Sequence, residues 1–243
     1  MDTKNIITTI LFDLDETLSD HSYSLERAFR VLESEFPILG TQPMPVLMDL
    51  HRESLDETFV DYLAKKITYV EAKEKRVAVF FKKLGVNLSD EELQKFITLY
   101  KLAYDSDRRA TPGTIKTLTT LREHGYKIGV VTNGEEDYQT AKLKEIGIEK
   151  MVDVLIASGA VGFAKPSPEI FAIALERMQA NKEEAVMIGD NLLSDVEGAL
   201  KFDIQALYYS PASTETSIQV CSTEVPVITH MEQVLTYLGI TSA

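Results

Sequence analysis

Short apolar runs recur along the chain and alternate with segments of helical periodicity. A short, nearly continuous apolar run bounded by turns is typical of a strand buried on both faces, as in a parallel sheet. We expect strands at Ile6–Phe12, Lys127–Val131, Val154–Ala157, Ala185–Ile188, Gln205–Tyr208 and Val225–Ile228. The Ser- and Thr-rich segment Ser210–Glu224 before the last of these predicts a surface loop. The alternation of strands and helices predicts an α/β fold with a doubly wound parallel sheet.

A long segment between the first and second predicted strands has no strand pattern. Its apolar residues recur at helical spacing, which predicts a bundle of amphipathic helices. Two capping boxes, Thr68 with Glu71 and Ser89 with Glu92, predict the starts of two of these helices. Since the segment leaves and re-enters the core at one point, it could act as a lid. The domain boundaries we predict are an α/β core at 1–18 and 107–243 and an all-helical insertion at 19–106.

The composition indicates a globular protein without a membrane partner. Hydrophobic residues make up 44% and charged residues 26% of the 243 residues, which excludes a disordered or fibrous chain. No apolar run approaches the roughly 18 residues that a membrane span needs, and we expect no signal peptide at the start. The single cysteine, Cys221, cannot form an intrachain disulfide. We therefore expect a cytoplasmic location.

The chain is strongly acidic, and this limits its partners. It has 25 Lys and Arg residues against 38 Asp and Glu residues, a formal net charge of −13. The average field of such a chain repels nucleic acid, so we expect no nucleic-acid partner. A small anion can still bind where positive charge is concentrated locally.

Polar residues follow four of the predicted strands. Asp13 and Asp15 come directly after the first strand, and Thr132 after the second. Lys165 lies in the connection after the third strand, and Asp190 follows the fourth. In an open parallel sheet the carboxyl ends of the strands share one edge, where ligands bind. We therefore expect these side chains to meet in one small crevice, a coincidence that chance placement would rarely produce.

These segments resemble the four motifs of the haloacid dehalogenase superfamily of phosphohydrolases, in the family's order. The matching residues are Asp13, Asp15 and Thr17 in DLDET, Thr132 in VVTNG, Lys165 in AKPSP, and Gly189, Asp190 and Asp195 in GDNLLSD. The helical insertion is similar to the family's cap of the first type. Glu16 departs from the glycine commonly found there, and the DETL variant is similar to the branch that contains nucleotidases. The segments TNG, AKPSPEIF and GDNLLSD also resemble that branch and some sugar-phosphate phosphatases.

The resemblance implies a role for each residue of the motifs. Asp13 would attack phosphorus and form an aspartyl-phosphate, which water then hydrolyses. Asp15 would protonate the leaving alkoxide and later take a proton from the attacking water. For the first of these steps the pKa of Asp15 should be raised by neighbouring carboxylates and partial burial. The transferring oxygens would be held by Thr132, by the amides of Asn133 and Gly134, and by Lys165.

The negative charges expected at this site indicate a cofactor. Asp13, Asp190, Asp195 and a phosphate would share one site, and two like charges about 4 Å apart repel by roughly 4 kcal/mol at an effective dielectric near 20. One lysine cannot offset several such pairs, so we predict a divalent cation, Mg²⁺ because the donors are oxygens. By resemblance its ligands are the carboxylates of Asp13 and Asp190 and the backbone carbonyl of Asp15. Asp195 would instead orient Lys165 or a metal-bound water.

The predicted function is hydrolysis of a small phosphomonoester, either a nucleoside monophosphate or a sugar phosphate. A 2-haloacid dehalogenase of the same superfamily would need neither a proton donor nor a metal, so Asp15 and Asp190 favour phosphate. A phosphomutase shares both aspartates and stays open, and a non-catalytic binding module is a third possibility. The sequence specifies neither the physiological substrate nor the oligomeric state.

Overall fold

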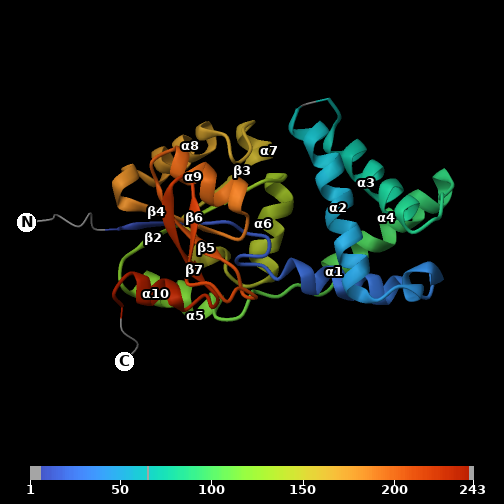
Figure 1. Cartoon of the computed structure of the whole chain (residues 1–243), viewed down its shortest axis with the longest axis horizontal. Coiled ribbons are helices and arrows are strands. Elements are labelled where there is room, and N and C mark those ends of the chain that lie inside the picture. Colours follow the sequence, from blue (N-terminus) through green and yellow to red (C-terminus); the bar gives the residue numbers. More distant parts are fainter. Residues whose placement is uncertain (1–6, 65, 241–243) are drawn as a thin grey trace, which may run out of the picture. The chain divides into compact units, whose positions relative to one another are not determined.

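The computed structural model of the chain describes residues 7–64 and 66–240, which form two compact units. The α/β unit comprises Met1–Asp20 and Arg109–Ala243, and the helical unit comprises His21–Arg108. The helical unit therefore begins at residue 21 and ends at residue 108, whereas the boundaries predicted from the sequence were residues 19 and 106. Figure 1 shows the strands gathered in one unit and α1 to α4 in the other.

The α/β unit is built on a seven-stranded sheet with the strand order β3-β2-β1-β4-β5-β7-β6. All neighbouring strands are parallel except β6 and β7. The strands are β1 (Thr9–Phe12), β2 (Lys127–Thr132), β3 (Val154–Ala157), β4 (Ala185–Gly189), β5 (Gln205–Tyr209), β6 (Ser217–Val220) and β7 (Thr223–Ile228). The order reverses on either side of β1, which makes β1 and its neighbours the switch point where ligands bind in such sheets.

The prediction for the segment before the last strand was wrong. Residues 210–224 contain β6 and the start of β7, which pair antiparallel at the edge of the sheet. In β6 only Ile218 and Val220 pack on the core, so the strand alternates polar and apolar residues instead of forming an apolar run. The predicted start of the first strand, Ile6, lies outside the described residues.

Helices cover both faces of the sheet, which confirms the predicted doubly wound fold (Figure 1). Successive residues of a strand point to opposite faces, and in β1 Ile10 and Phe12 pack into one core cluster while Leu11 packs into the other. All three are fully buried, which explains the continuous apolar run. The helices of this unit are α5 (Thr114–Glu123), α6 (Glu136–Glu145), α7 (Ser158–Val161), α8 (Pro168–Met178), α9 (Gly198–Lys201) and α10 (Gln233–Tyr237).

The helical unit contains α1 (His21–Leu32), α2 (Met44–Leu63), α3 (Tyr69–Lys83) and α4 (Asp90–Asp105). Both predicted capping boxes are present. Thr68 Oγ1 accepts a hydrogen bond from the Glu71 amide at 3.2 Å, and the Glu71 carboxylate accepts one from the Thr68 amide at 2.7 Å. Ser89 and Glu92 form the same pair of bonds at the start of α4. Among the residues that the structure describes, no helix combines the length and the apolar character needed to cross a membrane.

His51 of α2 is buried inside the helical unit against aromatic rings. The ring of Phe29 meets it edge-on at 5.9 Å between centroids, and Phe80 does so at 6.2 Å. Burial lowers the pKa of His51 well below its ordinary value, and the nearby charges of Arg76 and His21 lower it further. The imidazole is therefore neutral in the folded chain at pH values where it is protonated in the unfolded chain.

This difference predicts a pH-dependent stability. Below about pH 6.5 the unfolded chain binds a proton at His51 that the folded chain does not, so acid should cost up to about 1.4 kcal/mol per pH unit until the folded pKa is reached. A His51→Phe variant should lose this part of the acid sensitivity, as measured by urea unfolding at pH 5 and pH 7.5. The exposed His230, changed to Phe, is the control and should keep the wild-type dependence. Identical pH dependence in the wild type and His51→Phe would contradict the assignment.

Candidate active site

The candidate site lies at the carboxyl ends of three neighbouring strands. β1 lies between β2 and β4, with Phe12 in register with Val130 and Ile188. Asp13 follows β1, and its amide donates to the carbonyl of Ile188 at 2.9 Å. Thr132 is the last residue of β2. The parallel register therefore brings residues far apart in the sequence to one edge of the sheet.

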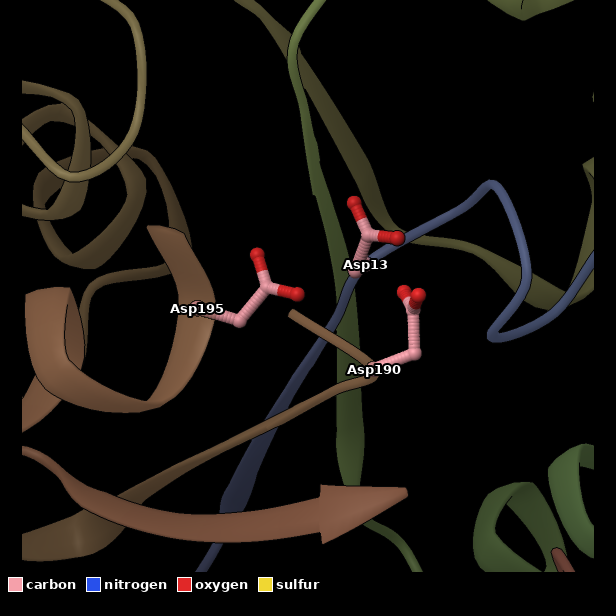
Figure 2. A group of neighbouring side chains, drawn as sticks. All are labelled: Asp13, Asp190 and Asp195. Atoms are coloured by element: carbon pink, nitrogen blue, oxygen red, sulfur yellow. The ribbon is translucent and has the colours of Figure 1, made fainter. Parts of the chain in front are cut away.

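Three carboxylates meet at this edge. Ligand oxygens of Asp13, Asp190 and Asp195 all lie within 4.8 Å of one another. Figure 2 shows the carboxylates of Asp13 and Asp190 close together just past the ends of their strands, with Asp195 pointing toward them from a neighbouring turn. Asp13 and Asp195 are buried, and Asp190 is partly exposed. Asp13 and Asp190 are thus close enough to share one cation.

A π-helical turn, η4 (Leu192–Glu197), places Asp195. The carboxylate of Asp195 accepts a hydrogen bond from the Asn191 amide at 3.0 Å, which folds the turn back toward β4. A Cβ at Gly189 would lie 2.3 Å from an oxygen of Asp195. Only glycine leaves room there, because the backbone of β4 and this carboxylate pack directly against each other.

Lys165 joins two of the three acids. Its ammonium contacts an oxygen of Asp13 and lies 2.7 Å from Asp195, and its side chain is 2% exposed. The loop that carries Lys165 is tied to the loop after β2 by the Asn133 side chain. Asn133 Oδ1 accepts from the Lys165 amide at 2.8 Å, and Asn133 Nδ2 donates to the Lys165 carbonyl at 3.0 Å.

The charges in this cluster are unbalanced. Burial raises the pKa of Asp13 well above its ordinary value. Lys165 partly opposes this rise in the pKa, and the nearby charges of Asp195 and Asp190 reinforce it. Burial, Asp195 and Glu16 raise the pKa of Asp190 to about 7. Burial alone would lower the pKa of Lys165, but Asp13 and Asp195 outweigh it, and that pKa is raised. Three acids face one lysine, so the site favours added positive charge.

The donor chemistry of the cluster fits Mg²⁺. A cluster made of carboxylate oxygens alone suits a hard divalent cation, whereas zinc sites commonly include His or Cys. The three acids together with one lysine leave an excess negative charge that such an ion would offset. Asp190 also accepts a hydrogen bond from Thr17 Oγ1 at 3.2 Å, which holds its carboxylate in place.

The side chain of Asp15 does not belong to the acid cluster and instead pairs with Lys142 of α6. Lys142 Nζ lies 2.6 Å from one oxygen of Asp15 and 2.7 Å from the other. The neighbours of Asp15 predicted from the sequence were carboxylates, and Lys142 was missed. A signal existed, because Lys142 shares a helical stripe with the buried residues Gln139, Leu143 and Ile146.

The groups predicted to hold phosphate oxygens differ in their surroundings. The Thr132 hydroxyl is buried and accepts a hydrogen bond from Gln139 Nε2 at 2.9 Å. That bond occupies an acceptor site of the hydroxyl and directs its own proton elsewhere. The Gly134 amide, predicted to bind phosphate, donates to Ser158 Oγ at 3.0 Å instead, because the loop after β2 packs against the start of α7.

Glu16 occupies a backbone conformation that favours glycine. Its φ is +62°, in the left-handed region. The turn there is closed by the Glu16 amide, which donates to the Ser19 carbonyl at 2.8 Å. A glycine is therefore the residue of least strain at this position, and glutamate costs about 1 kcal/mol more.

A buried carboxylate beside a lysine, at the switch point of a doubly wound sheet, is typical of an enzyme site. Comparison with known families agrees. The sequence model of the haloacid dehalogenase-like hydrolases matches residues 7–203, which include every residue of the site. The chain belongs to this family of hydrolases.

Two relatives extend the comparison. The chain is 29% identical over 237 residues to a glyceraldehyde 3-phosphate phosphatase of Pyrococcus furiosus, which covers 96% of this chain and 93% of the relative. It is 32% identical over 185 residues to the pyrophosphatase PpaX of Listeria innocua, covering 76% of this chain and 75% of the relative.

Solved structures share the fold. The hydrolase YfnB of Bacillus subtilis superposes with a TM-score of 0.77 at 21% identity, covering 96% of this chain and 99% of YfnB. A phosphatase of the family from Thermococcus onnurineus has a TM-score of 0.63 at 26% identity, covering 98% and 100%. The L-2-haloacid dehalogenase of Xanthobacter autotrophicus reaches 0.74 at 17% identity, covering 97% and 100%, so fold alone does not separate the two chemistries.

Proposed function

We propose that the chain is a Mg²⁺-dependent phosphomonoester hydrolase that works through an aspartyl-phosphate on Asp13. The observation that carries the proposal is the environment of Asp13. Its carboxylate is buried at the end of β1, contacts the Lys165 ammonium, and lies within 4.8 Å of Asp190 and Asp195. Such a group is placed to attack an electrophile that a cation and a lysine hold in line.

In the first step, an oxygen of Asp13 forms a bond to phosphorus while the bond from phosphorus to the ester oxygen breaks. The leaving alkoxide takes a proton from Asp15. Lys165 and the Thr132 hydroxyl offset the charge on the transferring oxygens, a contribution that is large when donors are fixed in place before the reaction.

In the second step, water attacks the phosphorus of the aspartyl-phosphate and gives its proton to Asp15. The bond between phosphorus and the Asp13 oxygen breaks, inorganic phosphate forms, and the Asp13 carboxylate is restored. Asp15 thus acts first as an acid and then as a base, and each step leaves it ready for the next.

The metal would be held by the carboxylates of Asp13 and Asp190 and the backbone carbonyl of Asp15. When bound, Mg²⁺ supplies positive charge that the cluster lacks and lowers the repulsion between the nucleophile and an anionic substrate. Asp195 lies 2.7 Å from Lys165, which supports a role in orienting that lysine.

The substrate we propose is a small phosphorylated metabolite, either a sugar phosphate or a nucleoside monophosphate. The relatives named as glyceraldehyde 3-phosphate phosphatases favour a sugar phosphate. The relative named as a pyrophosphatase adds pyrophosphate as a third candidate. We propose that the helical unit serves as the cap that selects among these substrates, and that the enzyme is cytoplasmic.

A substrate screen tests the proposal. Purified protein is incubated with phosphorylated metabolites and pyrophosphate, with Mg²⁺ or with EDTA, and ranked by kcat/KM for phosphate release. We expect Mg²⁺-dependent release of free phosphate from at least one small phosphomonoester. Isomerised sugar phosphate as the product would favour a phosphomutase, and halide released from a 2-haloacid without Mg²⁺ would favour a dehalogenase.

The Thr132 hydroxyl provides a further test, because we propose that it binds the transferring phosphoryl group. Thr132→Val keeps the shape of the side chain but removes the donor, so kcat/KM should fall by roughly 10²-fold. The exposed Thr236 of α10, changed to Val, is the matched control and should leave kcat/KM unchanged. Wild-type kinetics for Thr132→Val would show that the hydroxyl does not contact the transferring group.

A further inference from the structure

We propose that Lys142 of α6 is a positioning residue that holds the Asp15 carboxyl group in place for proton transfer. The inference rests on the proposed function, in which Asp15 exchanges protons with the leaving group and with water. The observation is a two-oxygen contact, with Lys142 Nζ at 2.6 and 2.7 Å from the two carboxylate oxygens of Asp15. An ammonium that contacts both oxygens fixes where the carboxyl group lies and how its plane is turned.

The burial of the pair is unequal, which separates it from an ordinary surface ion pair. The Lys142 side chain is 4% exposed, whereas that of Asp15 is 32% exposed. Surface pairs contribute little and hold their side chains loosely. Burying a lysine is costly unless a partner compensates, and here the partner is the carboxylate on the open side. The buried lysine therefore holds the more accessible carboxylate of Asp15 in place.

The helix that carries Lys142, α6, is held in place by its packing on the core. Leu143 of α6 and Ile146, which follows its last residue, are buried in the core cluster on one face of the sheet. The ammonium lies 5.0 Å from the centre of the Tyr138 ring, a second contact that limits its movement. A lysine on a packed helix can hold a carboxylate to a narrower range of positions than a lysine on a loop.

The same face of α6 holds a second residue of the site. Gln139 lies one turn before Lys142 and donates from Nε2 to the Thr132 hydroxyl at 2.9 Å. Gln139 is 2% exposed, so both positioning side chains are buried. One helix thus contacts the residues proposed for proton transfer and for phosphate binding, which links the position of Asp15 to that of Thr132.

The role predicts a dependence on the leaving group. A correctly placed Asp15 matters most when the leaving group is a poor one that must be protonated as it departs. p-Nitrophenyl phosphate releases a stable anion, whereas benzyl phosphate, of similar size, releases an alkoxide. The first-turnover rate of alcohol or phenol release therefore separates loss of Asp15 positioning from a general loss of the site.

The experiment compares Lys142→Met, Lys142→Arg and Asp15→Asn with the wild type in Mg²⁺ by rapid quench. For Lys142→Met we expect a roughly 10²-fold loss of the first-turnover rate on benzyl phosphate, less than about 10-fold on p-nitrophenyl phosphate, and an unchanged KM. Lys142→Arg should recover most of the rate. The exposed Lys144, two residues along α6 and changed to Met, is the matched control and should match the wild type.

A double variant tests that Lys142 acts through Asp15. The Lys142→Met and Asp15→Asn changes together should be no slower than Asp15→Asn alone, since the two residues form one unit. Circular dichroism checks folding, and Lys142→Gln removes the charge a second way if the Met variant is unfolded. Equal losses on both substrates, additive losses in the double variant, or wild-type rates for Lys142→Met and Lys142→Gln would overturn the proposal. A wild type that releases no phosphate from any phosphomonoester would instead overturn the proposed function itself.

Discussion

Changing Asp13 to Asn is expected to lower kcat by roughly 10⁴-fold or more, because an amide oxygen is a far weaker nucleophile than a carboxylate. The substitution keeps the shape of the side chain and the strand that carries it. It also removes one of three crowded negative charges, and Lys165 keeps its contact with Asp195 at 2.7 Å. We therefore expect Asp13→Asn to fold as the wild type does and to bind Mg²⁺ more weakly. The measurement is the rate of phosphate release from the best substrate of the screen.

A covalent readout separates the nucleophile from its neighbours. Acid-quenched wild type, caught during turnover, should carry one phosphoryl group on the peptide that contains Asp13, and the Asp13→Asn variant should carry none. The exposed Asp137, at the start of α6, undergoes the same Asp-to-Asn change as a control and should retain full activity. More than a tenth of wild-type activity in Asp13→Asn, or a phosphoryl group on another residue, would show that the nucleophile is elsewhere.

Much of the sheet could be predicted because burial on both faces leaves a local mark in the sequence. Every residue of β1 is buried, so Ile10, Leu11 and Phe12 form an unbroken apolar run. The grouping of Asp13 with Asp190 also followed from topology, since parallel strands bring their carboxyl ends to one edge. Neither inference needed side-chain positions, only strand order and direction.

The contacts that sequence patterns missed depend on the exact packing of loops and helices. The Gly134 amide bonds to Ser158 only because two connections meet in space, and no periodicity records that meeting. The pair of Lys142 and Asp15 joins residues 127 positions apart. The edge strand β6 was missed because only one of its faces packs on the core, so polar and apolar residues alternate along it over only four positions. Long-range contacts and short edge strands leave weak local signals.

Removing the metal is the second change for which we expect a large effect. Treatment with EDTA should lower kcat by roughly 10³-fold, since a bound cation contributes several kcal/mol of charge stabilisation, and added Mg²⁺ should restore it. Asp190→Asn should show the same loss without recovery at moderate Mg²⁺. The amide oxygen of Asn can still accept the hydrogen bond that Thr17 donates to Asp190. The loss of activity would therefore result from the missing negative charge and not from a missing hydrogen bond.

Stability gives a readout of the metal site that is independent of activity. Burial, Asp195 and Glu16 raise the pKa of Asp190 to about 7 from an ordinary 3.8 in the metal-free protein. The folded chain therefore binds a proton at Asp190 between these values that the unfolded chain releases, so the contribution of Asp190 to stability is greatest below pH 3.8 and is lost as the pH rises through 7.

An Asn at position 190 carries no charge, so metal-free Asp190→Asn should melt roughly 5–10 °C above the metal-free wild type at pH 8. The difference should shrink toward pH 4. Mg²⁺ should raise the Tm of the wild type and close the gap, because a cation offsets the repulsion among the three acids, but it should change the variant little. Equal melting of both proteins at pH 8, with no response of the wild type to Mg²⁺, would mean that the acid cluster is not a metal site.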